Sequence, residues 1–102
     1  KSRRTKSFRK FYESLPAEIK EQAREAYKLW RANPQHPSLH FKIVDSRFSV
    51  WSVRINQNYR VLGVKEKDKD GTDNMIWFFI GDHQTYARKI DVIEKIIAGL
   101  WM

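Results

Sequence analysis

The sequence predicts an α+β domain: an N-terminal helical hairpin packed on a twisted antiparallel sheet of about four strands, with a C-terminal helix. Two observations carry this prediction. Apolar residues recur every three to four positions over the first third of the chain, which is the period of a helix. From residue 39 onward the chain changes to short runs of β-branched and aromatic residues separated by turns. Its 102 residues fit one domain, so residues 1–102 are assigned to a single domain.

Two helices are expected before residue 34. Thr5 is a suitable N-cap for the first, which carries an apolar stripe at helical spacing made of Phe8, Phe11, Tyr12 and Leu15. Pro16 ends this helix and suits the first turn of the next, expected over residues 16–32. Since almost no residues separate the two helices, they are expected to form an antiparallel hairpin.

Strands are expected over residues 39–44, 48–55, 59–66 and 74–81. The last is apolar at every position from Met75 to Ile80, which indicates a strand buried on both faces. A short polar segment follows, and a final helix is expected from Asp91, with Glu94 at the capping-box position. This helical extension, residues 91–102, has an apolar side that should pack on the domain, made of Ile93, Ile96, Ile97 and Leu100.

The charge is concentrated at one end of the chain. Lys and Arg number 20 against 12 Asp and Glu, and six of the basic residues but no acidic residue lie in the basic head, residues 1–10. Such a head favours a polyanionic partner, nucleic acid or an acidic protein, although a solvated arm has the same composition. Within it, Arg3, Arg4 and Lys6 are candidate RNA contacts.

Composition also excludes several classes of protein. The chain has no cysteine, which excludes disulfides, Cys-ligated zinc and thiol catalysis. No apolar run is long enough to span a membrane, and no secretory signal is visible. We therefore expect a cytoplasmic protein without a membrane partner.

The segment from Trp51 to Arg60 carries the most informative pattern. If residues 56–58 form a three-residue loop with Asn58 left-handed, Arg54 lies directly opposite Arg60 on one face. Like charges directly opposite each other destabilise a sheet, so the pair makes physical sense if an anion, ideally a phosphate, lies between them. Two alternatives stay open: each arginine pairs with a nearby carboxylate, or a loop of different length places them on opposite faces.

Other candidates for chemistry flank this hairpin. His83 and Tyr86 follow the buried strand at i, i+3 spacing; histidine suits proton transfer near neutral pH, and tyrosine offers a ring and a hydroxyl. The alternative for His83 is a surface residue at a helix start. Lys42 is either a phosphate contact or an edge-strand lysine that prevents aggregation. A proline keeps His36 and His40 off one helical face, which disfavours a metal site.

Taken in order, these motifs resemble the RelE/ParE superfamily of type II toxins, closest to its RelE- and YoeB-like ribosome-dependent mRNA interferases. The resemblance covers about residues 5–90 and rests on four segments: Pro37-Ser-Leu-His-Phe-Lys42, Trp51-Ser-Val-Arg-Ile55, Tyr59-Arg-Val-Leu-Gly-Val64 and Trp77-Phe-Phe-Ile-Gly-Asp-His-Gln-Thr-Tyr86. It implies a small RNase fold whose concave basic face cuts mRNA on the ribosome without a metal or other cofactor. It also implies a cognate antitoxin that wraps and neutralises the toxin.

The resemblance implies a role for each site residue. By position, Arg54 and Arg60 bind the scissile phosphate and stabilise its developing charge. His83 is the general acid or base, and Tyr86 orients the substrate or stacks on it. Lys42 is a weaker correspondence.

Three features depart from the family pattern. Only residues 1–5 precede the first helix, so the strand that usually opens the fold is short, truncated or absent. The glutamate that acts as base in YoeB-like members has no clear counterpart, and Asp45 is at best a shifted stand-in. Residues 91–102 extend past the usual end.

Two other functions fit the same fold and charge. One is a ParE-like toxin that binds DNA gyrase and is not a nuclease, and the other is a non-catalytic basic RNA-binding domain. The set of Arg54, Arg60, His83 and Tyr86 favours the nuclease, because a gyrase binder has no need of it.

Overall fold

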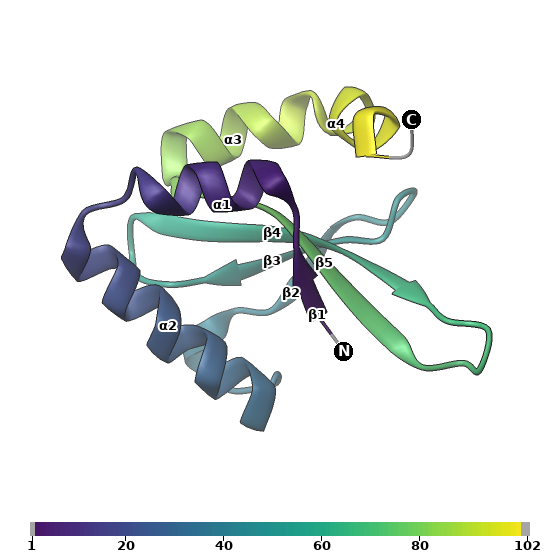
Figure 1. Ribbon diagram of the computed structural model, residues 1–102, viewed down its shortest axis with the longest axis horizontal. Coiled ribbons are helices and arrows are strands. Elements are labelled where there is room, and N and C mark those ends of the chain that lie inside the picture. Colours follow the sequence, from purple (N-terminus) through teal and green to yellow (C-terminus); the bar gives the residue numbers. More distant parts are fainter. Residues whose placement is uncertain (1, 101–102) are drawn as a thin grey trace.

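A computed structural model describes residues 2–100 and confirms the predicted α+β class. Its sheet has the strand order β1-β5-β4-β3-β2 (Figure 1). The strands are β1 (Ser2–Arg4), β2 (Lys42–Asp45), β3 (Val50–Arg54), β4 (Tyr59–Lys67) and β5 (Asp73–Asp82). The helices are α1 (Lys6–Glu13), α2 (Ala17–Ala32), the short 3-10 helix η1 (Pro37–Leu39), α3 (His83–Asp91) and α4 (Ile93–Leu100).

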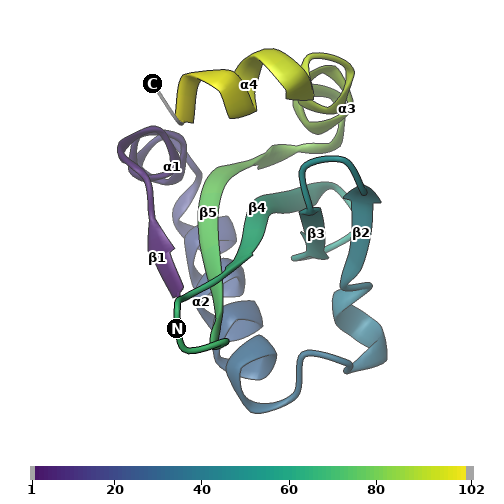
Figure 2. The same ribbon diagram turned by 90° about the vertical axis from the view of Figure 1, so that its right-hand side faces the viewer.

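The sheet has a fifth strand, β1, whose presence the sequence prediction left open. The sheet is therefore mixed and not wholly antiparallel as predicted. β1 pairs in parallel with β5, with Arg4 opposite Trp77 (Figure 2). The backbone N–H of Thr5 continues this pairing and donates to the carbonyl of Trp77 at 3.0 Å. From Ser2 onward, the basic head is therefore built into the fold as β1 and the first turns of α1, and it is not a solvated arm.

The central hairpin gives the sheet two faces of different character. Its register pairs Val50 with Val64, Ser52 with Leu62 and Arg54 with Arg60, and the side of the sheet that carries these residues is here called the arginine face. The opposite side, the tryptophan face, carries Trp51, Val53, Val61 and Gly63. Helices α3 and α4 lie over the arginine face, whereas α2 lies on the other side of the sheet (Figures 1 and 2).

The core on the arginine face joins the sheet to the C-terminal helices. Val50 and Leu62 are fully buried there against Ile93 and Ile97 of α4. A bulge in β5 leaves Phe78 without a partner between the pairs made by Trp77 and Phe79, and both phenylalanines pack into this core. Every residue from Met75 to Ile80 is at most 5% exposed, so the prediction of a strand buried on both faces is confirmed.

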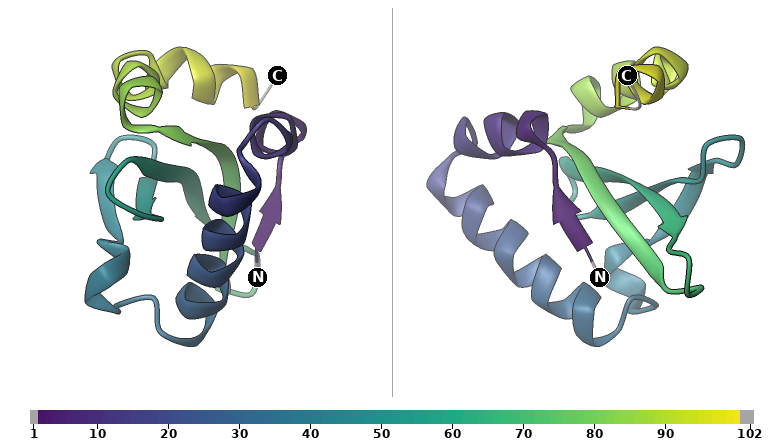
Figure 3. Two further views of the ribbon diagram at one scale, coloured as in Figure 1. Left: turned by 90° about the vertical axis from the view of Figure 1, so that its left-hand side faces the viewer. Right: turned by 45° about the vertical axis from the view of Figure 1, so that its right-hand side comes forward.

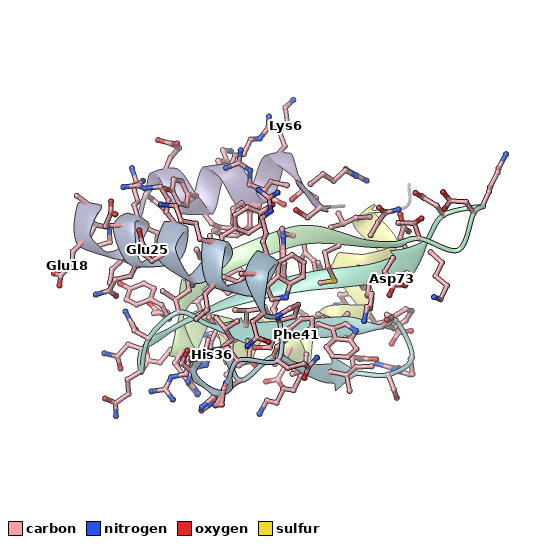
Figure 4. The ribbon with its side chains drawn as sticks, turned by 90° about the horizontal axis from the view of Figure 1, so that it is seen from below. Lys6, Glu18, Glu25, His36, Phe41 and Asp73 are labelled. Atoms are coloured by element: carbon pink, nitrogen blue, oxygen red, sulfur yellow. The ribbon has the colours of Figure 1, made fainter. Side chains whose placement is uncertain are left out.

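The core on the tryptophan face is an aromatic layer beneath α2. The Trp30 ring of α2 meets the Trp77 ring edge to face at 5.1 Å, and Phe41 stacks on Trp51 at 4.7 Å. Figure 4 looks onto this side and shows Phe41 beside the strands. A Cβ at position 63 would lie 2.5 Å from the Trp77 ring, so glycine is needed for that ring to lie across β4.

The N-terminal helices begin as predicted. Thr5 caps α1, its Oγ1 accepting the backbone N–H of Phe8 at 3.1 Å, and α2 begins directly after Pro16. The two helices diverge in a V instead of packing along their length as the predicted hairpin would (Figure 3). Because of this, α1 packs on β5 while α2 crosses the tryptophan face.

The C-terminal segment differs from the prediction of one helix beginning at Asp91. Asp82 is the N-cap of α3, its carboxylate accepting the backbone N–H of Thr85 at 2.8 Å. Asp91 is instead the last residue of α3, and the chain bends at Val92 before α4, so the capping box predicted for Asp91 and Glu94 is wrong. The first turn of α3 escaped prediction because it is polar.

Two strands begin later than predicted. Residues 37–39 form η1, which Pro37 starts and His40 ends with a left-handed φ of 44°, so β2 begins at Lys42. β3 begins at Val50 because Asp45 turns the chain, its Oδ1 accepting the N–H of Arg47 at 3.0 Å. These turns shorten the edge strand β2 and its neighbour β3.

The apolar stripe of the C-terminal extension packs on the domain as expected. Ile93 and Ile97 are each 3% exposed, and Ile96 packs against them. The structure describes neither residue 1 of the basic head nor residues 101–102 of the extension, and it does not describe the Leu100 side chain.

We expect Ile97→Ala to lower the free energy of unfolding by about 2–5 kcal/mol, because it leaves a cavity between α4 and the arginine face. A urea melt followed by circular dichroism measures this. Val92→Ala is the matched control, since the Val92 side chain is 43% exposed and its loss should change the midpoint little. Equal midpoints for the two variants would contradict the packing of α4 on the sheet.

Candidate active site

The β3–β4 hairpin brings Arg54 and Arg60 directly opposite each other on the arginine face. The N–H of Ile55 donates to the carbonyl of Tyr59 at 3.1 Å, which closes the loop of residues 56–58. The predicted three-residue loop and its consequence for the two arginines are therefore confirmed. The alternative, in which another loop length places them on opposite faces, is excluded.

Asn56, and not a left-handed Asn58, shapes this loop. The only described non-glycine residues with positive φ are His40 and Ser49, so the conformation predicted for Asn58 is wrong. The Asn56 Oδ1 accepts the N–H groups of Asn58 at 2.8 Å and Tyr59 at 3.0 Å, an Asx turn that replaces the left-handed residue. Its amide also donates to Gln22 Oε1 at 2.5 Å and so ties the loop to α2.

The Arg60 side chain folds back over the same loop. Its Nη1 donates to the carbonyls of Asn56 at 2.6 Å, Tyr59 at 3.0 Å and Gln57 at 3.3 Å. These are neutral acceptors, so they fix the guanidinium without cancelling its charge. The loop therefore holds a cation in place and leaves its positive field directed at the site.

No carboxylate within residues 2–100 forms a salt bridge with Arg54 or Arg60. The alternative in which each arginine has an acidic partner is therefore excluded for the described chain. Partial burial lowers the pKa of Arg60, and the positive charge of Arg54 lowers it further, while Tyr86 opposes both effects. Two cations that repel each other and lack a counter-ion form a ready site for an anion.

The start of α3 carries His83 and Tyr86 to the same end of the sheet. The backbone N–H of His83 donates to the carbonyl of Asn58 at 2.7 Å, so the helix start is fixed on the hairpin loop. The two rings lie 5.7 Å apart between centroids. His83 is exposed, whereas Tyr86 is 9% exposed within the core of the arginine face. That burial fits orientation of neighbouring groups better than stacking on a base.

His40 is the residue that sequence reasoning did not place in this site. Its Nε2 lies 3.3 Å from Arg54 Nη1. His36 does not accompany it, because the His36 Nδ1 caps η1 by accepting the N–H of Ser38 at 3.2 Å. No local pattern indicates this contact, because the left-handed backbone of His40 breaks the alternation of sides that an extended chain would give it with Lys42.

Lys42 lies on the arginine face beside the two arginines. It is opposite Ser52, one step along β3 from Arg54 on the same face, and its side chain is exposed. Both predicted readings stay compatible with this position, since β2 is also the edge strand of the sheet.

The structure does not bring the basic head to the arginine pair. Arg4 pairs with Trp77 whereas Arg60 pairs with Gly81, and four residues of strand separate the two positions by about 13 Å. Arg3 lies beside Arg4 on β1, and Lys6 points away from the sheet (Figure 4). Arg4 lines the groove beneath α2, and Arg3 lies in a different hollow beside Glu66 and Asp68, so these residues do not join the arginine pair.

Asp45 is also remote from the arginine pair. It is opposite Val50, which lies four residues before Arg54, about 13 Å along β3. Its carboxylate accepts a hydrogen bond from Arg47 at 3.1 Å, and this bond lowers the pKa of Asp45. Asp45 is therefore neither placed nor tuned to act as the missing base. No group of three or more potential metal-ligating His, Asp or Glu residues occurs among residues 2–100.

A concave surface, the α2 groove, lies between α2 and the tryptophan face. It has a volume of about 420 Å³ and apolar walls that include Trp30, Trp77 and Ala26. Four cations also line it, Arg4, Arg24, Lys28 and Arg31, and no described acidic residue does. The indole N–H groups of Trp30 and Trp77 have no acceptor among the described residues.

Comparisons with known proteins place this fold among small bacterial and archaeal toxins. It resembles the YoeB/ParE toxin from Agrobacterium tumefaciens at a TM-score of 0.62, with 16% identity over 81% of this chain and 98% of that one. The RelBE2 toxin–antitoxin complex from Mycobacterium tuberculosis gives a TM-score of 0.58, with 20% identity over 80% of this chain and 95% of that one. The RelB–RelE complex from Methanococcus jannaschii gives 0.57, with 16% identity over 83% and 94%.

The sequence itself defines the family. The ParE-like toxin domain matches residues 17–88, well over half of the chain. The chain therefore belongs to the ParE-like toxin domain family, and the predicted RelE/ParE resemblance is confirmed. No curated protein matches the sequence. None of the helices described is long and apolar enough to cross a membrane.

We expect Asp82→Ala to lower the free energy of unfolding by about 1 kcal/mol near pH 7, because the N-cap that starts α3 beside His83 is lost. The Thr85 N–H lowers the pKa of Asp82 below its ordinary 3.8, so the charged cap stabilises the fold above that value. This contribution disappears as the pH falls through the lowered pKa. Urea melts at about pH 7 and about pH 2 measure the difference.

Asp82→Asn is the matched control, because asparagine keeps the capping oxygen without a titratable charge. Its stability relative to Asp82→Ala should not depend on pH. A loss in Asp82→Ala that is equally large at both pH values would contradict the role of the ionised cap.

Proposed function

We propose that this toxin is a metal-independent endoribonuclease that cleaves mRNA on the ribosome and blocks translation. The observation that supports this most strongly is the pair formed by Arg54 and Arg60, held opposite each other with no described carboxylate as partner. Fork-shaped guanidiniums in this arrangement match the oxygens of a phosphodiester. A protein that acts on ribosomes in this way works in the cytoplasm.

The chemistry needs only groups that the arginine face supplies. The ribose 2′-OH attacks the adjacent phosphorus, the P–O5′ bond breaks, and Arg54 and Arg60 stabilise the charge that develops on the phosphate. His83 moves a proton as general acid or base, and Tyr86 orients the groups around it. Lys42 contacts a neighbouring phosphate, and Arg3, Arg4 and Lys6 add sequence-independent attraction for RNA.

We expect Arg54→Ala and His83→Ala each to slow mRNA cleavage by at least about 10²-fold, as loss of a charge clamp or a proton donor does. Cell-free translation with the purified protein, followed by mapping of the mRNA ends, measures the rate. Arg31→Ala is the control for charge, because Arg31 lies on the far side of the sheet in the α2 groove.

The family match favours a second candidate, a ParE-like toxin that inhibits DNA gyrase without cleaving RNA. A supercoiling assay with purified gyrase tests it directly. If the wild-type protein inhibits gyrase and leaves mRNA intact, or if Arg54→Ala and His83→Ala still block translation fully, the nuclease proposal is wrong.

We further propose that an antitoxin binds in the α2 groove as an acidic amphipathic helix. Two of the structural neighbours are toxin–antitoxin complexes. The groove offers apolar walls for one side of a helix and has four cations at its rim. Arg24 and Lys28 already pair with Glu21 and Glu25 of α2, so Arg4 and Arg31 are the cations that we propose for acidic residues of the antitoxin. The apolar side of α4 is not free for such a helix, because Ile93 and Ile97 pack on the sheet of their own chain.

We expect Ala26→Trp to weaken binding of the antitoxin encoded beside the toxin gene by at least about 10-fold, because the new ring fills the groove. Calorimetric titration measures the affinity, and mRNA cleavage should be unchanged. Ala32→Trp is the control, since Ala32 is exposed on the same helix and does not line the groove. Equal affinities for the two variants would place the antitoxin elsewhere.

A further inference from the structure

We propose that His40 is the general base of the arginine face and takes the proton from the attacking 2′-OH. This inference rests on the proposed nuclease function and adds to it the residue that the sequence left unassigned. The base cannot be Asp45, which lies about 13 Å along the strand and is held by Arg47. His40 Nε2 lies 3.3 Å from Arg54 Nη1, within hydrogen-bond distance of the pair.

The contact with Arg54 identifies the His40 nitrogen that could act as a base. A guanidinium has donors only, so in the 3.3 Å contact Arg54 Nη1 donates and His40 Nε2 accepts. A nitrogen that accepts this hydrogen bond presents its lone pair to the site, and a lone pair is what a general base needs. The charged group that faces this nitrogen is Arg54, and Lys42 is the next cation on the same face.

Binding of a phosphate would release this lone pair at the right place. The phosphate oxygens are stronger acceptors for Arg54 than a neutral imidazole, since hydrogen bonds between charged groups are the stronger ones. When Arg54 turns to the phosphate, His40 Nε2 becomes free beside the guanidinium that holds the substrate. The contact with Arg54 therefore places Nε2 of the base beside the position that the phosphate would take.

The backbone at His40 supports a functional reading. Its φ and ψ of 44° and 43° lie in the left-handed region, which a residue with a Cβ adopts less readily than glycine. Glycine would fit this C-cap position better than histidine. Backbone strain of this kind is found most often at functional sites, and here it occurs beside the Arg54–Arg60 pair.

His40 and His83 lie on opposite sides of the arginine pair. Crossing the sheet from β2 to α3, the order is His40, Arg54, Arg60 and then His83. In-line displacement at phosphorus requires the attacking and leaving oxygens on opposite sides of the phosphate. A base on the β2 side and an acid on the α3 side meet that requirement, with the phosphate held between them.

The step balances with these two histidines alone. The 2′-O–P bond forms as His40 Nε2 takes the 2′-OH proton, and the P–O5′ bond breaks as protonated His83 gives its proton to the 5′ oxygen. The products are a 2′,3′-cyclic phosphate and a free 5′-hydroxyl. Proton exchange with water then returns both histidines to their starting states.

The test is the pH dependence of single-turnover mRNA cleavage on programmed ribosomes. For the wild type, the rate should fall at low pH as the base becomes protonated. His40→Asn removes the imidazole but keeps a residue that tolerates the left-handed turn. We expect it to cleave at least about 10²-fold more slowly and to lose the fall in rate at low pH. His83→Asn should keep that fall.

His36→Asn is the matched control, because the asparagine oxygen replaces the Nδ1 that caps η1. Its profile should match the wild type, and circular dichroism melts should show every variant folded. If His40→Asn is slow but keeps the wild-type fall at low pH, His40 only positions Arg54 and the inference is wrong. If the wild-type protein cuts mRNA at no pH, both the proposed nuclease function and the inference about His40 are wrong.

Discussion

The repulsion between Arg54 and Arg60 is the constraint on which the rest of this site depends. Antiparallel pairing places the two residues opposite each other, where like charges raise the free energy of the sheet. The protein does not relieve this repulsion with a described carboxylate. Loop carbonyls hold Arg60 and, being neutral, leave its charge intact. Arg54 contacts the His40 imidazole. The free energy stored in this pair is recovered when an anion binds between the guanidiniums.

The local structure around the pair follows from that constraint. Asn56 organises the loop whose carbonyls bind Arg60, and the carbonyl of Asn58 fixes the start of α3 through the N–H of His83. Cation, loop and histidine are thus linked through backbone hydrogen bonds rather than through long side chains. Backbone positions vary less than exposed side chains, so the backbone sets the separation between the arginine pair and the start of α3, as the proposed chemistry would require. Helix α4, which follows α3, packs on the arginine face through Ile93 and Ile97.

The sequence predicted what depends on local pattern and missed what depends on distant contacts. The opposition of Arg54 and Arg60 was predictable because loop length alone determines it. The conformation of Asn58 was not, since the Asx turn made by Asn56 gives the same loop length by another route. β1 was left open because three residues carry little pattern, and their strand forms only by pairing with β5. His40 was missed because its contact with Arg54 joins residues fourteen positions apart.

The α2 groove and the arginine pair lie on opposite sides of one sheet, which constrains how an antitoxin in the groove could inhibit the toxin. A helix in that groove packs on the tryptophan face, whereas the proposed chemistry takes place on the arginine face. The sheet is one backbone thick, and the Arg54–Arg60 pair is at its hairpin end. A helix confined to the groove therefore leaves the arginines open. Neutralisation then requires the antitoxin chain to continue past an edge of the sheet, or its bulk to keep the toxin off the ribosome. Acidic residues in such a continuation would bind between the two guanidiniums as the phosphate does, so the pair that attracts the substrate would also hold the inhibitor.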